Sequence, residues 1–544
     1  MAKTKLELTW IGKENRFKLE PRILLEDPDK SHHAEHRVTD NDIFDNRLIF
    51  GDNLLALKAL EQEFTGKIKC IYIDPPYNTG KENWIYNDNV NSTEVRNWLG
   101  KVVGGDLEDL SRHDKWLCMM YPRLMLLHKM LRDDGSIFIS IDDNEITHLH
   151  NIMREIFGAG NFVANIIWQK RTSPDARIHL GPAHDFIVVY AKNLSKLKPT
   201  LKRVLPSGER TKAYKNPDDD PRGVWASVDL TGQTGHATPD QFFEITTPAG
   251  VKMKPPAGRC WALAERTFLE LVANNRVWFG KNGKSRPRLK KFLNENDGVT
   301  TWTWWPHVEV GHNQEATKEL NEIMSQADVF DNPKPTRLIR RILQLASEKD
   351  SIILDSFAGS GTTGNAIFQL NKQDVVNRRF ILVEMDSNIC RNVTAERLRR
   401  ACVGYSKPDG TKVEGMGSGF RFATLGEPLF DERGNIRSTV PFADLARHVY
   451  FTETGEPLTK QTEMLNPLIG VCRGTGIYLL YNGILKDKSP GGGNVLTTAV
   501  LARLPKHDGP KVIYGTACRI GAERLRNENI VFKQLPYKLR VDAL

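Results

Sequence analysis

Apolar residues in the first third of the chain fall into short runs that are separated by amphipathic stretches. Short β-branched runs are typical of buried strands, and apolar residues repeated every three to four positions are typical of helices. The pattern predicts strands at 48–50, 68–73 and 136–141 and helices at 54–64, 116–131 and 143–157. Strands that alternate with helices predict an α/β fold with a parallel sheet.

This periodicity is lost between about residues 168 and 326, where Pro, Gly, Trp, Lys and Arg are frequent. It then resumes with a helix at 336–348, a strand at 351–354, a glycine-rich turn followed by a helix that ends near residue 370, and a strand at 379–383. We therefore expect one doubly wound α/β domain that is interrupted by an insert of about 160 residues.

A further segment, beyond about residue 426, shows its own helix and later strands. A chain of 544 residues is also too long for a single hydrophobic core. The expected division is an N-terminal segment (1–40), two halves of the α/β domain (41–165 and 327–425), the insert (166–326) and a smaller C-terminal α/β domain (426–544).

The overall charge favours a polyanionic partner, because the formal net charge is +9 and the isoelectric point is near 9.0. Seven scattered cysteines include no CxxC pair, which favours free thiols in a reducing cytoplasm over a zinc or redox site. The histidine-rich stretch 31–36 is expected to be a solvated loop, and no metal site is expected. No apolar run is long enough to span a membrane, so we expect a soluble cytoplasmic protein.

A glycine-rich loop at 355–364 follows a predicted strand and opens a helix. It matches GxGxxG, and Glu384 ends the next strand twenty residues after Gly364. Such glycines let the backbone approach a ligand closely, and an acid at this distance can accept hydrogen bonds from ribose hydroxyls. Asn365 stands where a Walker A loop has lysine, so the loop predicts an adenosine-bearing ligand without choosing among several.

The tetrapeptide Asp74-Pro75-Pro76-Tyr77 lies just past the end of a predicted strand, where ligands bind in open α/β sheets. Its two prolines stiffen the loop and remove two backbone donors. The Asp74 carboxylate and the Pro75 carbonyl can each accept a hydrogen bond from an aromatic amine, and Tyr77 can stack on the ring that carries the amine. These four residues are our predicted catalytic group.

Three segments together resemble the amino-methyltransferases of DNA: 73–80, 140–145 and 357–363. The tetrapeptide precedes the glycine loop by 281 residues, with the insert between them. This order is similar to that of the β class, and the likeness is greatest to modification subunits of type III restriction systems. The resemblance implies an interrupted S-adenosylmethionine-dependent methyltransferase domain and a target-recognition role for the insert.

The resemblance also implies the roles of particular residues. An aspartate at position 74 is similar to the adenine enzymes, whereas serine is commoner among cytosine-N4 enzymes. Asp355 would face the methionine end of the cofactor, and Glu384 would bind its ribose. The implied cofactor-binding residues are Asp52, Asn53, Lys334, Asp355, Phe357, Gly359, Gly361, Thr362 and Glu384.

The insert holds a basic run near several tryptophans, which predicts contact with double-stranded DNA. The predicted DNA-binding residues are Lys281, Lys284, Arg286, Arg288, Lys290 and Lys291. A solvated basic loop is the alternative interpretation. No helicase or nuclease motif is found, so any restriction activity requires a separate subunit. The resemblance favours an assembly role for the C-terminal segment, with a homodimer as the expected state.

Three other functions remain open on the sequence alone. A dinucleotide-dependent oxidoreductase would explain the glycine loop and Glu384 but not the tetrapeptide. A non-catalytic DNA-binding protein would explain the basic insert but not an intact Asp74. Methylation of the cytosine-N4 amine, rather than adenine N6, is the nearest alternative, and RNA is a less favoured substrate than DNA.

Overall fold

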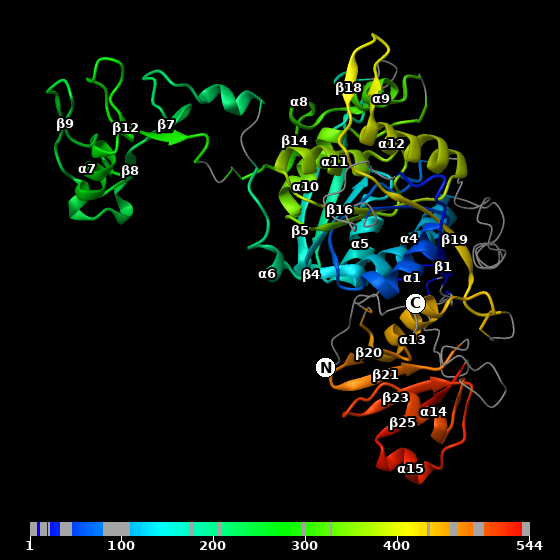
Figure 1. The fold of residues 1–544 in the computed structure, drawn as a ribbon. Helices are drawn as coiled ribbons and strands as arrows, with labels where there is room; N and C mark the ends of the chain where they lie inside the picture. The colour runs from blue at the N-terminus through cyan, green and yellow to red at the C-terminus, as the bar shows by residue number, and fades with distance from the viewer. Residues whose placement is uncertain are drawn as a thin grey trace. The chain divides into compact units, whose positions relative to one another are not determined.

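The computed structural model divides the chain into two compact units, which are Met1–Leu201 with Thr303–Leu544, and Lys202–Trp302. Figure 1 shows their elements in order along the chain. The residues described are 8–10, 13, 19, 22–32, 46–79, 109–174, 179–204, 208–295, 298, 300–326, 329–431, 436–456, 458, 466–481 and 494–535. Most of the predicted N-terminal segment, of the histidine-rich stretch and of the polar loop 78–114 lies outside them.

A mixed sheet of ten strands forms the centre of the larger unit, within its described residues. Neighbouring strands run parallel from β19 to β4, and β6 then pairs antiparallel with both β4 and β5. In order across the sheet, the strands are β1 (Arg22–Glu26), β19 (Arg421–Pro428), β2 (Arg47–Phe50), β16 (Arg379–Glu384), β15 (Ile352–Asp355), β3 (Ile68–Ile73), β4 (Leu131–Ile141), β6 (His184–Ala191), β5 (Phe162–Gln169) and β14 (Trp304–Trp305).

Helices cover both faces of this sheet (Figure 1). One layer is α1 (Asn53–Phe64), α4 (Asp109–Met130) and α5 (Ile146–Phe157), and the other is α10 (Thr336–Ala346), α11 (Thr362–Asp374) and α12 (Ala395–Val403). Alternate residues of β3 supply the two cores, because Ile71 and Ile73 pack with the first layer while Cys70 and Tyr72 pack with the second. A strand that is buried on both faces is expected to be mostly apolar, as β3 is, and its one charged residue, Lys69, is buried with its ammonium bonded to Asp134 and Thr200.

The predicted strands and helices around the sheet are confirmed, most of them within two or three residues of the expected bounds. The main difference lies at the start of the expected insert, 166–326. There β5 and β6 extend the sheet, and β14 joins it from the far end, so the compact second unit is the shorter segment Lys202–Trp302. These strands were not predicted from the sequence, because polar residues lie within and beside their apolar runs.

The neighbours β3 and β15 lie at the point where the order of the sheet reverses. From β3 the chain continues to β4 on one side, whereas from β15 it continues to β16 on the other. Crevices form at the carboxyl ends of strands at such a point, because the following loops diverge to opposite faces. Asp74 follows β3 directly, and Asp355 is the last residue of β15. The two predicted site loops therefore start from neighbouring strand ends.

The second unit is built from short strands and one helix around its own small core. Strand β13 (Arg288–Phe292) lies between β7 (Trp225–Asp229) and β12 (Val277–Trp278). The remaining elements include β8 (Thr231–Gln233), β9 (Ile245–Thr246), β10 (Lys252–Met253), β11 (Arg259–Trp261) and α7 (Glu265–Ala273).

The C-terminal segment has a four-stranded sheet of its own, in the order β20-β21-β23-β25. Within the larger unit, a hydrogen bond of 2.9 Å joins Gln62 on α1 to His448 on α13 of this segment. Its elements are α13 (Phe442–Thr454), β20 (Leu468–Cys472), β21 (Thr475–Leu479), β22 (Val495–Leu496), α14 (Thr498–Arg503), β23 (Lys511–Gly515), β24 (Ala517–Cys518), α15 (Ala522–Asn527) and β25 (Ile530–Gln534). Among the described residues, no helix combines the length and apolarity that crossing a membrane requires.

Candidate active site

The loop after β3 is held rigidly by contacts at both of its ends. The Tyr77 hydroxyl donates a hydrogen bond of 2.9 Å to Asp74 Oδ1. The Trp116 indole, fully buried on α4, donates one of 2.8 Å to the Pro76 carbonyl. Burial, together with the nearby negative charge of Asp74, raises the pKa of Tyr77 well above its usual value, so the phenol stays protonated and remains a donor.

Lys334 brings a positive charge onto this loop from the segment before α10. Its Nζ donates to Asp74 Oδ2 and forms an ion pair with it. The same ammonium lies 5.2 Å from the centre of the Tyr77 ring and 6.0 Å from that of Trp168, within the range of cation–π attraction. The resemblance implied a cofactor-binding role for Lys334; its ammonium contacts the predicted catalytic residues Asp74 and Tyr77, and its carbonyl accepts a hydrogen bond from Thr362.

The glycine loop turns sharply between β15 and α11. Gly359 has φ +49° and Gly361 has φ +76°, conformations that residues with a β-carbon rarely adopt. The buried Asp355 carboxylate accepts hydrogen bonds from the Phe357 backbone at 3.0 Å and from the Thr363 hydroxyl at 2.5 Å. These two bonds hold the loop in a tight curve against the strand end.

Glu384, the last residue of β16, binds the loop from the other side. Oε2 accepts a hydrogen bond of 2.8 Å from the Gly359 backbone, and Oε1 accepts one of 2.9 Å from the Asp386 backbone. Burial raises the pKa of Glu384 and that of Asp355 to about 7 in each case. Each carboxyl group can therefore lose its proton when a cation or a strong hydrogen-bond donor binds beside it.

A cavity of about 730 Å³ joins the two loops. All of the predicted catalytic residues line it, and so do most of the predicted cofactor-binding residues. Those lining residues are Asp74, Pro75, Pro76, Tyr77, Lys334, Asp355, Phe357, Gly359, Thr362 and Glu384. The predicted residues Gly361, Asp52 and Asn53 are not among the residues that line it.

Asp52 and Asn53 lie behind the glycine loop and support it. Asp52 caps helix α1 by accepting a 3.0 Å hydrogen bond from the Leu55 backbone. Asn53 donates a 2.9 Å bond to the Ser356 carbonyl and accepts one of 2.5 Å from Arg123. Asn53 contacts the glycine loop directly, whereas Asp52 acts through the start of α1 and through Arg123, which bonds to both residues.

One buried acidic residue of the cavity is not among the site residues predicted from the sequence. Asp185, at the start of β6, is 3% exposed and forms an ion pair of 2.5 Å with Lys170. Its pKa is raised, mainly by burial. An aspartate next to the apolar run 186–191 was the available signal, because such a residue needs a reason to be buried. The cavity thus gathers several carboxyl groups and suits a ligand that carries positive charge.

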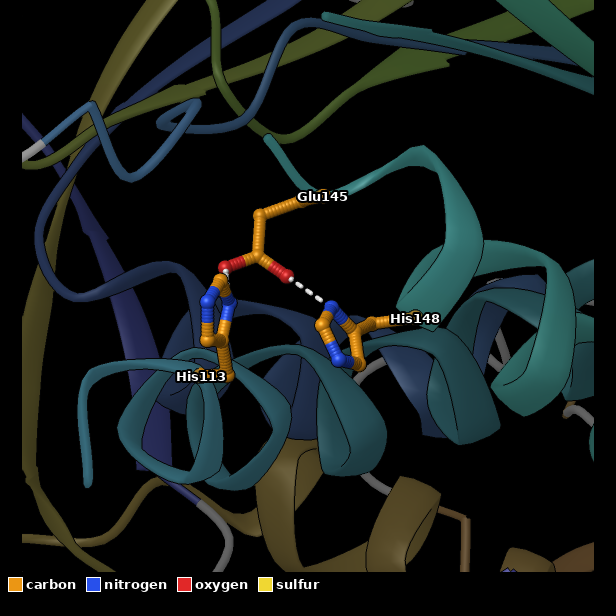
Figure 2. Close-up of side chains that lie close together, drawn as sticks. All are labelled: His113, Glu145 and His148. Atoms are coloured by element: carbon orange, nitrogen blue, oxygen red, sulfur yellow. Dashed lines mark hydrogen bonds and ion pairs between the residues drawn. The ribbon is translucent and has the colours of Figure 1, made fainter. Parts of the chain in front are cut away.

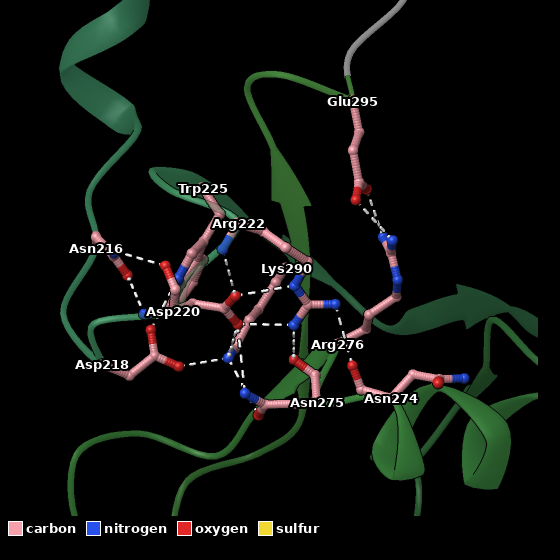
Figure 3. Close-up of polar contacts among 10 residues, drawn as sticks. All are labelled: Asn216, Asp218, Asp220, Arg222, Trp225, Asn274, Asn275, Arg276, Lys290 and Glu295. Atoms are coloured by element: carbon pink, nitrogen blue, oxygen red, sulfur yellow. Dashed lines mark hydrogen bonds and ion pairs between the residues drawn. The ribbon is translucent and has the colours of Figure 1, made fainter.

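The second unit alters the set of residues that could contact DNA. Lys290 is 1% exposed, and its ammonium bonds to Asp218, to Asp220 at 3.0 Å and to Asn275 at 3.2 Å (Figure 3). It is therefore part of the internal structure and cannot reach a phosphate in this fold. The remaining predicted residues are exposed: Lys281, Lys284, Arg286, Arg288 and Lys291.

Sequence comparisons place the chain among known proteins. The profile of the DNA methylase family N6_N4_Mtase matches residues 68–396, more than half of the chain. The type III restriction-modification enzyme StyLTI Mod subunit of Salmonella typhimurium is 33% identical over 87% of this chain and 74% of its own length. The EcoPI Mod subunit of Escherichia phage P1 is 32% identical over 73% of this chain and 66% of its own length.

Solved structures resemble the chain only loosely. PvuII DNA methyltransferase (cytosine-N4-specific) aligns with a TM-score of 0.34 at 12% identity, covering 65% of this chain and 87% of its own. A putative DNA modification methylase from Thermus thermophilus aligns with a TM-score of 0.31 at 15% identity, covering 68% of this chain and 99% of its own. The profile match and the similarity to the Mod subunits lead to the same conclusion: the chain belongs to the N6/N4 DNA methylase family.

Proposed function

We propose that this chain transfers a methyl group from S-adenosylmethionine to N6 of adenine in double-stranded DNA, as the modification subunit of a type III restriction-modification system. The observation that carries the proposal is the cavity in which the Asp74 loop and the glycine loop meet at neighbouring strand ends. The names of the similar Mod subunits support the assignment to a type III system.

The glycine-loop side of the cavity fits the cofactor, which supplies an activated methyl group on a cationic sulfur. Asp355 is suited to the ammonium of its methionine part. Glu384 already accepts backbone hydrogen bonds from Gly359, Met385 and Asp386, and a carboxylate with about four lone pairs can still accept one from a ribose hydroxyl. Phe330 and Phe357 offer apolar surface at the same end of the cavity. The raised pKa of both carboxyl groups would fall as they ionise beside a cation.

The tetrapeptide side fits a flipped adenine. Extruding a base from the duplex costs a few kcal/mol, and stacking on Tyr77 would offset part of that cost. Asp74 and the Pro75 carbonyl would each accept a hydrogen bond from the N6 amine, which draws its lone pair out of the ring. Asp74 would then stabilise the positive charge that develops on nitrogen and hold the proton that the amine loses.

Lys334 affects how the amine can bind, because in the free protein its ammonium already bonds to one of the two Asp74 oxygens, Oδ2. An entering amine would have to displace it or share that carboxylate with it. The lysine thus orients Asp74 and neutralises its charge until the base binds. When the amine displaces the ammonium from Asp74, the rings of Tyr77 and Trp168 can still stabilise it by cation–π attraction.

The unit Lys202–Trp302 is proposed as the target-recognition domain, within the insert expected at 166–326. Its exposed basic residues at 281–291 suit contacts with phosphates and base edges. The segment beyond residue 426 is proposed to serve assembly, either of a homodimer or with a separate restriction subunit that carries helicase and nuclease activity. A cytoplasmic location is proposed together with these partners, because the DNA substrate lies there.

A transfer assay tests the proposal. The purified chain is incubated with S-adenosylmethionine labelled on its methyl group and with plasmid DNA, or with RNA of similar length. Label is expected in DNA and not in RNA, and long-read sequencing of the product should find one recurring recognition sequence. Label in RNA alone, or in neither nucleic acid, would rule the proposed function out.

A further inference from the structure

Two histidines and a glutamate converge behind the catalytic loop. His113 Nδ1 on α4 lies 2.6 Å from one oxygen of Glu145, and His148 Nδ1 on α5 lies 2.9 Å from the other (Figure 2). The two imidazole rings are 4.5 Å apart between centroids and tilted by 30°. The three side chains therefore face one small space from two segments of the chain, α4 and the start of α5.

Glu145 poses an electrostatic problem. Its side chain is completely buried, and its contacts among the described residues are the two histidines and the Asn78 amide. No lysine or arginine within this part of the chain contacts it. A buried carboxylate without a compensating cation is costly by several kcal/mol, so a positive charge belongs at this point.

The geometry between Glu145 and His148 suggests where that charge lies. Glu145 Oε2 and His148 Nδ1 are both buried atoms, and although they lie 2.9 Å apart, neither makes a hydrogen bond to a described residue. The His148 nitrogen and the Glu145 oxygen are therefore not oriented for a hydrogen bond with each other. The three potential ligand atoms lie within 4.8 Å of one another, and they would move closer by up to about 1.4 Å around a tetrahedral zinc ion, whose ligand atoms lie about 3.4 Å apart.

The donor set selects the type of ion. Two imidazole nitrogens and one carboxylate are the ligands of zinc and of similar borderline transition metals, whereas magnesium and calcium prefer oxygen alone. Three protein ligands leave a coordination position for water, and His113 and His148 are 25% and 33% exposed, which leaves an entry path. The Asn78 amide, which donates to Glu145, would orient that ligand from outside the coordination sphere.

From these contacts we propose that His113, Glu145 and His148 bind one divalent transition-metal ion, with zinc as the best match. The ion would join the start of α4, the start of α5 and, through Asn78, the end of the Asp74–Tyr77 loop. Because Trp116 on the same helix bonds to Pro76, the site would fix the loop from two directions. The proposal concerns ion binding alone and stands whether or not the chain methylates adenine.

Direct metal binding tests this inference. The full chain, prepared without a histidine tag and stripped with a chelator, is dialysed against zinc and its metal content measured, and Co²⁺ is titrated in parallel. One zinc per chain is expected, together with the visible absorption band of cobalt bound by nitrogen and oxygen. Zinc should also raise Tm. Retention of less than about 0.2 zinc per chain, or a cobalt spectrum unchanged from that of the free ion, would overturn the proposal.

Variants show where the ion binds. His113→Ala and His148→Ala replace partly exposed side chains and should each weaken zinc binding by roughly tenfold or more, with loss of the cobalt band. His150→Ala, a neighbouring histidine on α5 that contacts Phe162, should keep both. If the two ligand variants bind zinc as the wild-type chain does, the metal lies elsewhere and the assignment fails.

Discussion

Asp74 in the free protein already has a donor on each of its oxygens, Tyr77 on one and Lys334 on the other. An aspartate in this state is oriented and neutralised before any substrate arrives, which is the kind of preorganisation that lowers the barrier of a polar reaction. Lys334 is one of these two donors to Asp74, although the resemblance implied that it binds the cofactor.

Replacing Lys334 separates these two roles. Lys334→Gln removes the ammonium that orients Asp74, so the methyl-transfer rate at saturating cofactor should fall by about tenfold or more, while the Kd for S-adenosylmethionine changes by less than about threefold. Single-turnover kinetics and equilibrium binding measure the two quantities. The exposed Lys349→Gln serves as the control. A much larger Kd with an unchanged rate would restore the cofactor role.

Glu384 gives the folded protein a pH dependence of known sign. Burial raises its pKa from 4.5 to about 7, so between these values the unfolded chain has lost a proton that the folded chain still holds. The contribution of Glu384 to stability is therefore greatest below pH 4.5, decreases as pH rises towards 7 and is constant above. The shift corresponds to roughly 3 kcal/mol.

The variant Glu384→Gln cannot ionise and should lose this part of the dependence. Urea unfolding of the cofactor-free protein at several pH values between 5 and 8 gives the free energy of unfolding of both forms. The difference, wild type minus variant, should decrease with rising pH and level off above pH 7. A difference that stays constant over this range would show that Glu384 does not carry a raised pKa.

At the scale of elements, β13 carries two neighbouring lysines with opposite surroundings. Lys290 points inward, to Asp218 and Asp220, whereas Lys291 is exposed. Lys290→Met leaves Asp218 without its cation and Asp220 with Arg222 alone, and should destabilise the unit Lys202–Trp302 by about 1–3 kcal/mol. Lys291→Met should change stability by less than about 0.5 kcal/mol.

Thermal unfolding of the two variants, with proteolysis to report on this unit, measures the contrast. Equal loss of stability in both would contradict the internal role of Lys290, and a DNA-binding defect in a fully stable Lys290→Met protein would restore it to the DNA-contacting set. The comparison is closely matched because both changes lie on the same strand.

The elements around the sheet were predictable because each carries a strong local signal. The run 68–73 is apolar except for Lys69, as expected of a strand buried on both faces, and the glycine loop follows its strand directly. Strand β6 was not predicted, because its acidic start and its place next to a segment rich in Pro and Gly masked a run of six apolar residues. Its antiparallel pairing with β4 depends on contacts distant in sequence.

The candidate site could be predicted in part for the same reason. The tetrapeptide and the glycine loop are local patterns, and the cavity brings them together. The pairing of Lys334 with Asp74 spans 260 residues, and that of His113 with Glu145 spans 32, so neither left a local signal. The spacing Glu145-x-x-His148 was a weak clue to the second, because residues three apart share a helix face.

At the scale of the whole molecule, the net charge of +9 does not identify the surface that meets DNA. The exposed basic run of the second unit is the most concentrated candidate. Replacing Lys281, Lys284 and Arg286 with glutamine should weaken DNA binding and reduce the slope of log K against log salt by about 1 to 3, because each lost phosphate contact removes about 0.9 from it.

Binding measured at several salt concentrations reads out this slope. A control with the same loss of charge replaces Lys349, Lys372 and Lys506, which are exposed or half-buried in the larger unit. The control should retain the wild-type slope. If the control lowers the slope as much as the variant of the basic run does, the effect reflects total charge and the run has no special role.

We propose that Asp74, beside the glycine loop, directs methylation of adenine N6. The most direct test is mass spectrometry of nucleosides from DNA treated with the wild-type chain, with Asp74→Asn and with the exposed control Asp143→Asn. We expect N6-methyldeoxyadenosine from the wild type and the control, and a loss of at least about a hundredfold in Asp74→Asn, which should still bind S-adenosylmethionine. N4-methyldeoxycytidine as the product, or an active Asp74→Asn, would contradict this proposal.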